Sequence, residues 1–368
     1  MNFDFSEEQR TIQEQARTML AKECPATRVR EQLNDDATGD IALWKKMVEL
    51  GWPAIAIAEE HGGLGLSYLE LCVIAEELGR SLAPVPFIAS VYLGTELIKL
   101  AASADQQARW LPGLATGETV ATVALEHYPL NHRTQELSLI ARGDRLNGTV
   151  NAVLHGTLAN TLIALVQDEH QQPALFHVDL NQAGVERKPQ KSLDPSLPLA
   201  QLCLQDVHGT RLQGEPPLDQ SLSTLLDRVA VLLGFEQVGG CEAAIDMAKA
   251  YTAGRYAFGR QVASFQAIKH KVADMFVAKE LAKSNAYYGA WAMTAGEQEL
   301  PLAAATARVS AIDAYYLCSK ENIQAHGGMG FTWEFDCHLY YRRAQLLSTL
   351  IGGNPRWKQR LADSLLMA

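Results

Sequence analysis

The sequence predicts an α+β protein in which helices come first, strands follow and helices return. Three observations support this order: amphipathic helical spacing near the N-terminus, short β-type runs bounded by turn residues in the middle, and long apolar helical segments after residue 218. The composition shifts after Gly117 and again at Glu215-Pro216-Pro217. We therefore expect an N-terminal α-helical domain at residues 1–117, a middle β-barrel or β-sandwich domain at 118–217, and a C-terminal helical bundle at 218–368.

The N-terminal domain is expected to begin with a capped amphipathic helix. Ser6 is the predicted N-cap of a helical segment at 6–35, because two glutamates follow it and apolar residues then recur at helical spacing. Further helices are predicted at 41–50, ending at Gly51; at 68–78, ending at Gly79; near 88–101; and at 105–111.

The middle domain shows the pattern of short strands. Runs of β-forming residues bounded by Gly, Asn, Asp or Pro lie at 119–125, 137–141, 161–166 and 174–178. The stretch 144–149, which contains Asn147-Gly148, predicts a hairpin turn.

The C-terminal domain is dominated by one long helix. Residues 221–253 are apolar nearly all round, so we expect this helix at the centre of a bundle. Further helices are predicted from 268 onward and at 302–322, 338–350 and 355–367.

Composition limits the possible function. Lys and Arg total 32 against 42 for Asp and Glu, and the net charge of −10 argues against a nucleic-acid partner or an anionic membrane. The six cysteines are far apart and form no CxxC pair, so we expect neither a zinc site nor disulfides. Acidic residues near the N-terminus, and the lack of an apolar run of about 18 residues, favour a cytoplasmic protein.

Five short blocks, in this order, resemble the acyl-CoA dehydrogenase family. They are Gly51-Trp52, 59–65 (EEHGGLG), 76–80 (EELGR), 255–275 (beginning RYAFG) and 324–331 (QAHGGMGF). The resemblance spans nearly the whole chain and implies that the C-terminal domain is a four-helix bundle. It also implies FAD, lying between the β-domain and the bundle of one subunit, with its pyrophosphate and adenosine reaching a neighbouring subunit.

The resemblance also implies which residues bind the cofactor. Arg255, Phe258 and Gln266 would contact the pyrophosphate and adenosine, and Gln324 with Gly327-Gly328 would close over them from the other side. The residue types suit this role, because a guanidinium gives paired donors for a diphosphate and glycines allow close backbone approach. The alternative is that Arg255 pairs with an acid and the glycines only make a turn.

The expected catalytic base is not where the family carries it. Family chemistry removes the proton alpha to a thioester, and the position usually held by Glu is here Ile351, after Tyr341-Arg342-Arg343-Ala344. A minority of members carry the base on the first bundle helix, where alignment on Gly239 places Val229.

Within residues 222–241 of the first bundle helix, the acids are Asp227 and Glu236. Glu236 shares the face of Val229, two turns away, and is the candidate base; the alternative is that it pairs with a bundle arginine. Asp227 lies on the opposite face, and we expect it to favour the dipole near the helix start.

The β-domain also departs from the family pattern. The flavin-contacting motifs are replaced by 125–133 (LEHYPLNHR) and by Ala152-Val153-Leu154-His155, which removes hydrogen-bonding groups for the flavin ring. Glu126, His127 and His132 match no metal-ligand spacing, so no metal is expected.

These departures from the family pattern favour a chain that shares its FAD site with a different subunit. The resemblance is closest to subunits of heteromeric α2β2 acyl-CoA dehydrogenases that act in bacterial steroid or bile-acid side-chain degradation, a branch of lipid metabolism. It implies a bulky steroid-CoA substrate, a second acyl-CoA dehydrogenase-like chain, and an electron acceptor such as a flavoprotein. Three alternatives stay open: a homo-oligomeric dehydrogenase using Glu236, a non-catalytic assembly or regulatory subunit, and a flavin monooxygenase of the same fold.

Overall fold

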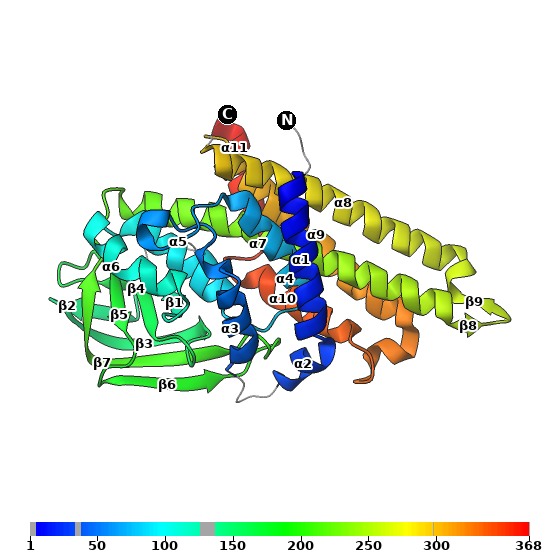
Figure 1. Cartoon of the computed structure of the whole chain (residues 1–368), viewed down its shortest axis with the longest axis horizontal. Helices are drawn as coiled ribbons and strands as arrows, with labels where there is room; N and C mark the ends of the chain where they lie inside the picture. Colours follow the sequence, from blue (N-terminus) through cyan, green and yellow to red (C-terminus); the bar gives the residue numbers. More distant parts are fainter. Residues whose placement is uncertain (1–4, 34–37, 126–136, 297, 368) are drawn as a thin grey trace. The chain divides into compact units, whose positions relative to one another are not determined.

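The computed structural model describes residues 5–33, 38–125, 137–296 and 298–367 (Figure 1). The chain forms two compact units. The sheet unit comprises Arg30–Ser67 and Pro84–Val229; the bundle unit comprises Met1–Val29, Tyr68–Ala83 and Ala230–Ala368. Along the sequence the elements follow the predicted order of helices, strands and helices.

The strands of the sheet unit close into a ring. They are β1 (Ala121–Ala124), β2 (Leu139–Arg142), β3 (Arg145–Leu154), β4 (Thr161–Gln167), β5 (Pro173–Asp179), β6 (Val185–Gln190) and β7 (Leu199–Arg211). Their order is β1-β4-β2-β3-β7-β5, and β5 pairs again with β4, while β6 pairs with β7. This second pairing of β4 makes a barrel rather than an open sheet.

The hairpin between β2 and β3 corrects the predicted turn. Arg142 pairs with Arg145, so the turn is Gly143-Asp144, and Asn147-Gly148 lies within β3 instead. Gly148 has a φ of +133°, and a Cβ there would lie 2.0 Å from the Ser138 carbonyl oxygen. The glycine therefore serves a bulge in the strand and not the turn.

The helices of the sheet unit precede the strands. They are α3 (Ile41–Glu49), the short helices η1 (Trp52–Ala54) and η2 (Glu59–His61), the π-helix η3 (Ile88–Thr95), α5 (Glu96–Ala101) and α6 (Ala104–Ala115). Asp40 caps α3, and Gly51 follows it with a left-handed φ of 73°. The single helix predicted near 88–101 is thus a π-helix followed by an α-helix, a distinction that apolar spacing does not reveal.

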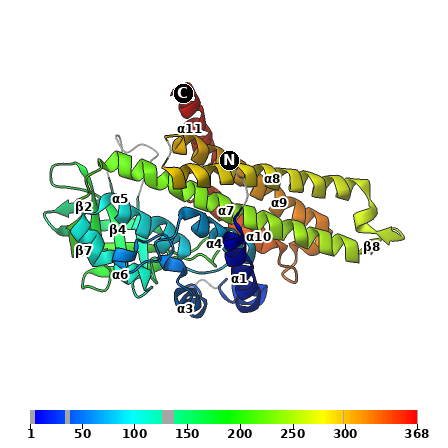
Figure 2. The same cartoon turned by 45° about the horizontal axis from the view of Figure 1, so that its top comes forward.

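The bundle unit consists mainly of helices. They are α1 (Glu7–Glu23), α2 (Ala26–Glu31), α4 (Tyr68–Ser81), α7 (Leu218–Gly254), α8 (Gln266–Ala295), α9 (Leu300–His326), α10 (Cys337–Thr349) and α11 (Asn354–Met367). Residues 30–31 of α2 and 218–229 of α7 belong to the sheet unit. The helix α8 lies beside α9 in both views (Figures 1 and 2).

Ser6 caps α1 as predicted, in a capping box with Gln9. The predicted single helix at 6–35 is wrong, however, because α1 ends at Glu23 and α2 starts at Ala26. Pro25 stands between them, and proline cannot continue a helix since it lacks the backbone N–H.

The prediction that α4 ends at Gly79 is also wrong, because the helix continues to Ser81. A Cβ on Gly79 would lie 1.8 Å from the Glu236 carbonyl oxygen, and a Cβ on Gly239 would lie 1.8 Å from the Glu76 carbonyl oxygen. The two glycines thus let the backbones of α4 and α7 touch, so Gly79 serves helix packing and not helix termination.

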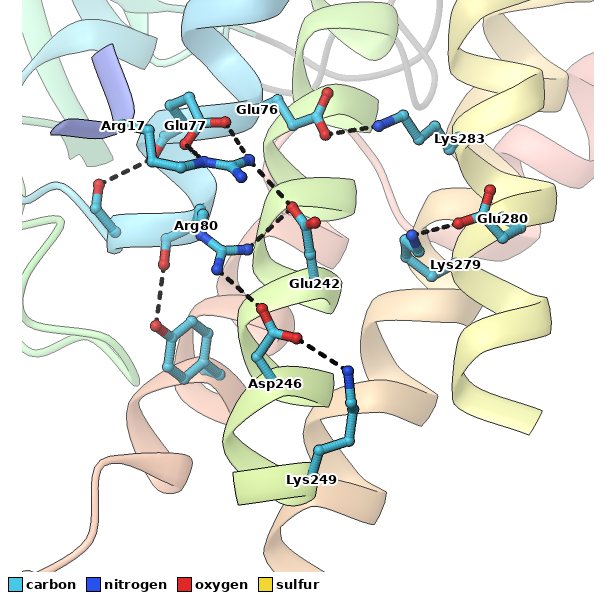
Figure 3. Close-up of polar contacts among 12 residues, drawn as sticks. Arg17, Glu76, Glu77, Arg80, Glu242, Asp246, Lys249, Lys279, Glu280 and Lys283 are labelled. Atoms are coloured by element: carbon cyan, nitrogen blue, oxygen red, sulfur yellow. Dashed lines mark hydrogen bonds and ion pairs between the residues drawn. The ribbon is translucent and has the colours of Figure 1, made fainter. Parts of the chain in front are cut away.

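An ion-pair network links α1, α4, α7 and α8 (Figure 3). Arg17 contacts Glu77 at 2.7 Å, Arg80 contacts Glu242 at 3.0 Å, and Lys283 contacts Glu76 at 3.1 Å. The side chains of Glu76 and Glu77 are only 1% exposed. Burial raises the pKa of Glu76, and the ammonium of Lys283 opposes that effect.

Candidate functional site

The first predicted cofactor segment forms a hairpin between α7 and α8. It consists of β8 (Tyr256–Ala257) and β9 (Arg260–Gln261) and extends from the ends of the two helices (Figures 1 and 2). The two turn residues, Phe258 and Gly259, have φ values of +53° and +80°, which is a type I′ turn. Phenylalanine is unfavourable in this conformation, and Phe258 is 96% exposed. Such strain and exposure are typical of a residue that contacts a ligand or another chain.

The start of α8 adds positive potential next to this hairpin. Phe265 occupies the N-cap position and offers no side-chain hydrogen bond, so the first N–H groups of the helix remain available near the exposed Gln266. The guanidinium of Arg260 lies 3.9 Å from the ring centroid of Phe265. Arg255 is exposed, and neither arginine forms an ion pair with a described residue. Exposed guanidinium groups that lack an ion-pair partner among the described residues, beside a helix N-terminus, suit a phosphate ligand.

The second predicted segment follows the end of α9. Gln324 is exposed in the last turn of this helix, and Gly327 with a φ of +59° leads into the short helix η5 (Gly327–Phe331). A Cβ on Gly327 or Gly328 would meet no atom within 4 Å. The backbone is therefore open to a ligand on this side.

The structure brings the two segments together in the bundle unit. The rings of Tyr251, one turn before Arg255, and of His326, the residue before Gly327, stack with centroids 4.1 Å apart. Lys271 of α8 forms an ion pair with Glu321 of α9 at 2.5 Å. The stack thus brings the residue four positions before Arg255 into contact with the residue directly before Gly327.

The two family positions for a catalytic base are apolar and buried. Val229 is 0% exposed and Ile351 is 6% exposed. In the described residues, therefore, neither place offers a carboxylate for proton abstraction.

Glu236 is buried next to arginines of the bundle core. Its Oε1 lies 3.6 Å from Nη1 of Arg343, whose Nη2 donates to the Leu82 carbonyl at 3.2 Å. Arg308 donates to Gln237 Oε1 at 2.7 Å and also to the Leu347 carbonyl. Burial lowers the pKa of Arg308 to about 9, and the Glu236 charge opposes this. This arrangement corresponds to the alternative in which Glu236 pairs with a bundle arginine, and its role as base stays a prediction.

Sequence reasoning did not identify Arg308 as part of this cluster. It has no local signature, because only the packing of α9 in the bundle brings it to Gln237. Asp227 also differs from expectation. It lies nine residues after the start of α7 at Leu218 and is 2% exposed, so the predicted dipole role is wrong, since that effect is confined to the first turn.

The substituted flavin-contacting motif of the β-domain packs into the sheet unit. Val153, Leu154 and His155 are buried, and His155 donates its backbone N–H to the Pro198 carbonyl at 2.7 Å. Ala152 and His155 both have positive φ, at 55° and 53°. The other motif, with Glu126, His127 and His132, lies outside the described residues.

Two family models match this chain. The family model for the acyl-CoA dehydrogenase N-terminal domain matches residues 6–118, and that for the C-terminal domain matches residues 219–366. The chain belongs to the acyl-CoA dehydrogenase family. This family consists of flavoprotein oxidoreductases that act on CH–CH groups. The predicted fold, with helical, β and helical parts in that order, is confirmed.

Individual relatives cover nearly the whole chain. Acyl-CoA dehydrogenase IpdE2 of Mycobacterium tuberculosis is 30% identical, over 97% of this chain and 97% of its own length. A solved structure titled Tcur3481-Tcur3483 steroid ACAD is 27% identical, with a TM-score of 0.86 and 98% of both chains covered. Butyryl-CoA dehydrogenase from Megasphaera elsdenii is 22% identical and shares the fold, with a TM-score of 0.90 over 100% of both chains. No helix in the described part of this chain is sufficiently long and apolar to span a membrane.

Proposed function

We propose that this chain is a subunit of an FAD-dependent dehydrogenase that introduces an α,β double bond into a bulky steroid side-chain CoA thioester. In this proposal a partner chain of the same family completes the FAD site and supplies the catalytic base. The observation that carries it is a contrast: the arginine Arg255 is exposed and the glycines Gly327-Gly328 are open, which suits FAD, whereas the two base positions, Val229 and Ile351, are apolar.

The cofactor-binding surface fits FAD on its own chemistry. Arg255 and Arg260 would bind the pyrophosphate together with the start of α8, while the open backbone at Gly327-Gly328 allows the cofactor to lie close. Gln266 and Gln324 would donate or accept hydrogen bonds, and the exposed ring of Phe258 would pack on the adenosine. When bound, FAD accepts the hydride that leaves the beta carbon of the substrate.

The requirement for a partner follows from the missing carboxylate. Proton abstraction alpha to the thioester needs a base held near the substrate, and neither expected position provides one. Glu236 is buried and its Oε1 lies 3.6 Å from Nη1 of Arg343, so in this proposal the carboxylate serves the bundle core and not the substrate. The steroid substrate is supported by the similarity to Tcur3481-Tcur3483, whose title describes a steroid ACAD.

Two alternative functions are each supported by one observation. A homo-oligomeric dehydrogenase would use Glu236, which lies on the family helix that carries the base in some members. A non-catalytic assembly or regulatory subunit would explain why both base positions are apolar. In either dehydrogenase, a second flavoprotein would act as electron acceptor.

Co-expression with a homologous partner chain tests the proposal. The purified pair should contain FAD and should oxidise a steroid side-chain CoA thioester in the presence of an artificial electron acceptor. The chain expressed alone should contain little FAD and show no turnover. Turnover by the isolated chain would favour the homo-oligomeric alternative, and an assembly without flavin would favour the non-catalytic one.

A further inference from the structure

We propose that Tyr251, His326 and Phe335 are positioning residues that hold the two FAD-binding segments at a fixed spacing. This inference rests on the proposed function, because it concerns the surface that we assign to FAD. None of the three residues is among those that the family resemblance assigns to the cofactor.

The three rings form a compact cluster inside the bundle unit. Tyr251 stacks on His326 with centroids 4.1 Å apart and planes inclined by 24°. Phe335 meets both rings edge-on, at 5.4 Å from Tyr251 and 5.5 Å from His326. Each residue belongs to a different part of the chain: the last turns of α7, the end of α9, and the loop before α10.

The cluster is connected to both cofactor segments through the backbone. The Tyr251 carbonyl accepts a hydrogen bond from the backbone N–H of Arg255 at 2.9 Å, so the tyrosine also fixes where the hairpin starts. His326 is followed directly by Gly327, where the open glycine backbone begins. A displacement between the Tyr251 and His326 rings would therefore change the distance between Arg255 and Gly327.

The protonation of His326 suits this mechanical role. Its Nδ1 lies 2.8 Å from the Asn322 carbonyl, so Nδ1 must carry a proton. Burial lowers the pKa of His326, and the ring is neutral near pH 7. A neutral ring stacks on tyrosine without the cost of burying a charge. The hydrogen bond and the stack together fix the plane of the ring.

The test compares variants that keep or remove the ring at position 251, in the assembly co-expressed with its partner chain. Tyr251→Phe retains the stack and should bind FAD as the wild type does. Tyr251→Leu loses two of the three ring contacts, and we expect about tenfold weaker FAD binding, measured by flavin fluorescence. In the chain without FAD, the same variant should show faster hydrogen exchange over Gly327–Phe331. Phe335→Leu, which removes only edge contacts, should show a smaller effect of the same kind.

Tyr287→Leu provides the matched control. Tyr287 also belongs to a buried aromatic cluster, 4.8 Å from Phe5 and 5.4 Å from Phe235, but it lies roughly 30 Å along α8 from Gln266. This variant should lower the melting temperature while FAD affinity stays unchanged.

The inference is overturned if Tyr251→Leu keeps wild-type affinity and exchange, or if Tyr287→Leu weakens FAD binding equally. If the wild-type assembly takes up no FAD, the proposed function fails. The exchange comparison in the cofactor-free chain still decides whether Tyr251 holds Gly327–Phe331 in place.

Discussion

Glu236 and Arg343 form a buried ion pair in the bundle unit, with Oε1 of the carboxylate 3.6 Å from Nη1 of the guanidinium. Both side chains are nearly inaccessible, at 4% and 1% exposure. Among the described residues of α7, Glu236 is the acid that shares the helix face of the family base position Val229, and it is engaged in the core. The pairing with Arg343 favours a structural role for Glu236 over a catalytic one.

Replacing Glu236 by Gln tests which role it has. The substitution leaves the guanidinium of Arg343 buried without its carboxylate, and we expect a loss of about 3 kcal/mol in folding stability. The assembly that does fold should keep its flavin and its turnover. Melting temperature, flavin absorbance and turnover of the purified assembly give the three readouts.

Glu242→Gln is the control for the first prediction. Glu242 lies on the same helix but is 30% exposed, so removal of its charge should change the melting temperature much less. Loss of turnover in Glu236→Gln, with fold and flavin intact, would identify Glu236 as the base and refute the need for a partner base.

A side chain at either glycine of the α4–α7 crossing, Gly79 or Gly239, should destabilise the fold. Gly79→Ala places a Cβ 1.8 Å from the Glu236 carbonyl oxygen, so the helices must separate. We expect a loss of about 3 kcal/mol or more, measured by thermal unfolding. Gly254→Ala, where a Cβ meets nothing within 4 Å, should be almost neutral. Equal melting temperatures for the two variants would show that the close contact is absent.

Arg255 should contribute strongly to FAD affinity. A charge-assisted hydrogen bond is typically worth about 1.5–3 kcal/mol, so Arg255→Ala should weaken FAD binding roughly 10- to 100-fold. Arg255→Lys should bind with intermediate affinity, because an ammonium keeps the charge without the paired donors. Arg142→Ala, which removes an exposed arginine from β2, should have no effect. Wild-type affinity in Arg255→Ala, measured by flavin titration, would remove this residue from the site.

Removal of Lys283, the partner of Glu76, should make the folding stability more dependent on pH. Burial raises the pKa of Glu76 in the folded chain. The contribution of Glu76 to folding stability is therefore complete below its unfolded pKa of about 4.3, and it is lost as the pH rises through its folded pKa. Lys283→Met raises that folded pKa further. We therefore expect a loss of about 3 kcal/mol at pH 8 and a smaller loss at pH 5.

The double variant Glu76→Gln with Lys283→Met is the control for this pH effect. It has no charge at either position, so the extra pH dependence should disappear. Thermal unfolding of both variants between pH 5 and pH 8 provides the comparison. An equal loss at the two pH values in Lys283→Met would contradict the proposed titration of Glu76.

Much of the fold could be predicted because the relevant signals are local. The Ser6 cap, the end of α3 before Gly51 and the apolar length of α7 depend on residues close in sequence. The glycine turn between Arg255 and Gln266 is also a local signal, and the role of these two residues in binding FAD stays a prediction.

The remainder depends on contacts between distant segments. In the sequence, Gly79 is typical of a residue that ends a helix. Its close approach to the Glu236 carbonyl shows instead that it lies where α4 crosses α7. Likewise, the stacking of Tyr251 on His326 joins residues at the ends of two helices that sequence spacing cannot relate. Such features appear only when the helices are packed together.

Native mass spectrometry of the assembly, purified after co-expression with a homologous partner chain, shows whether this chain shares its FAD site with a second chain. We predict a mixed α2β2 assembly that carries FAD, and an isolated chain without FAD. A homo-oligomer of this chain alone that carries one FAD per chain and oxidises acyl-CoA would rule out the shared site.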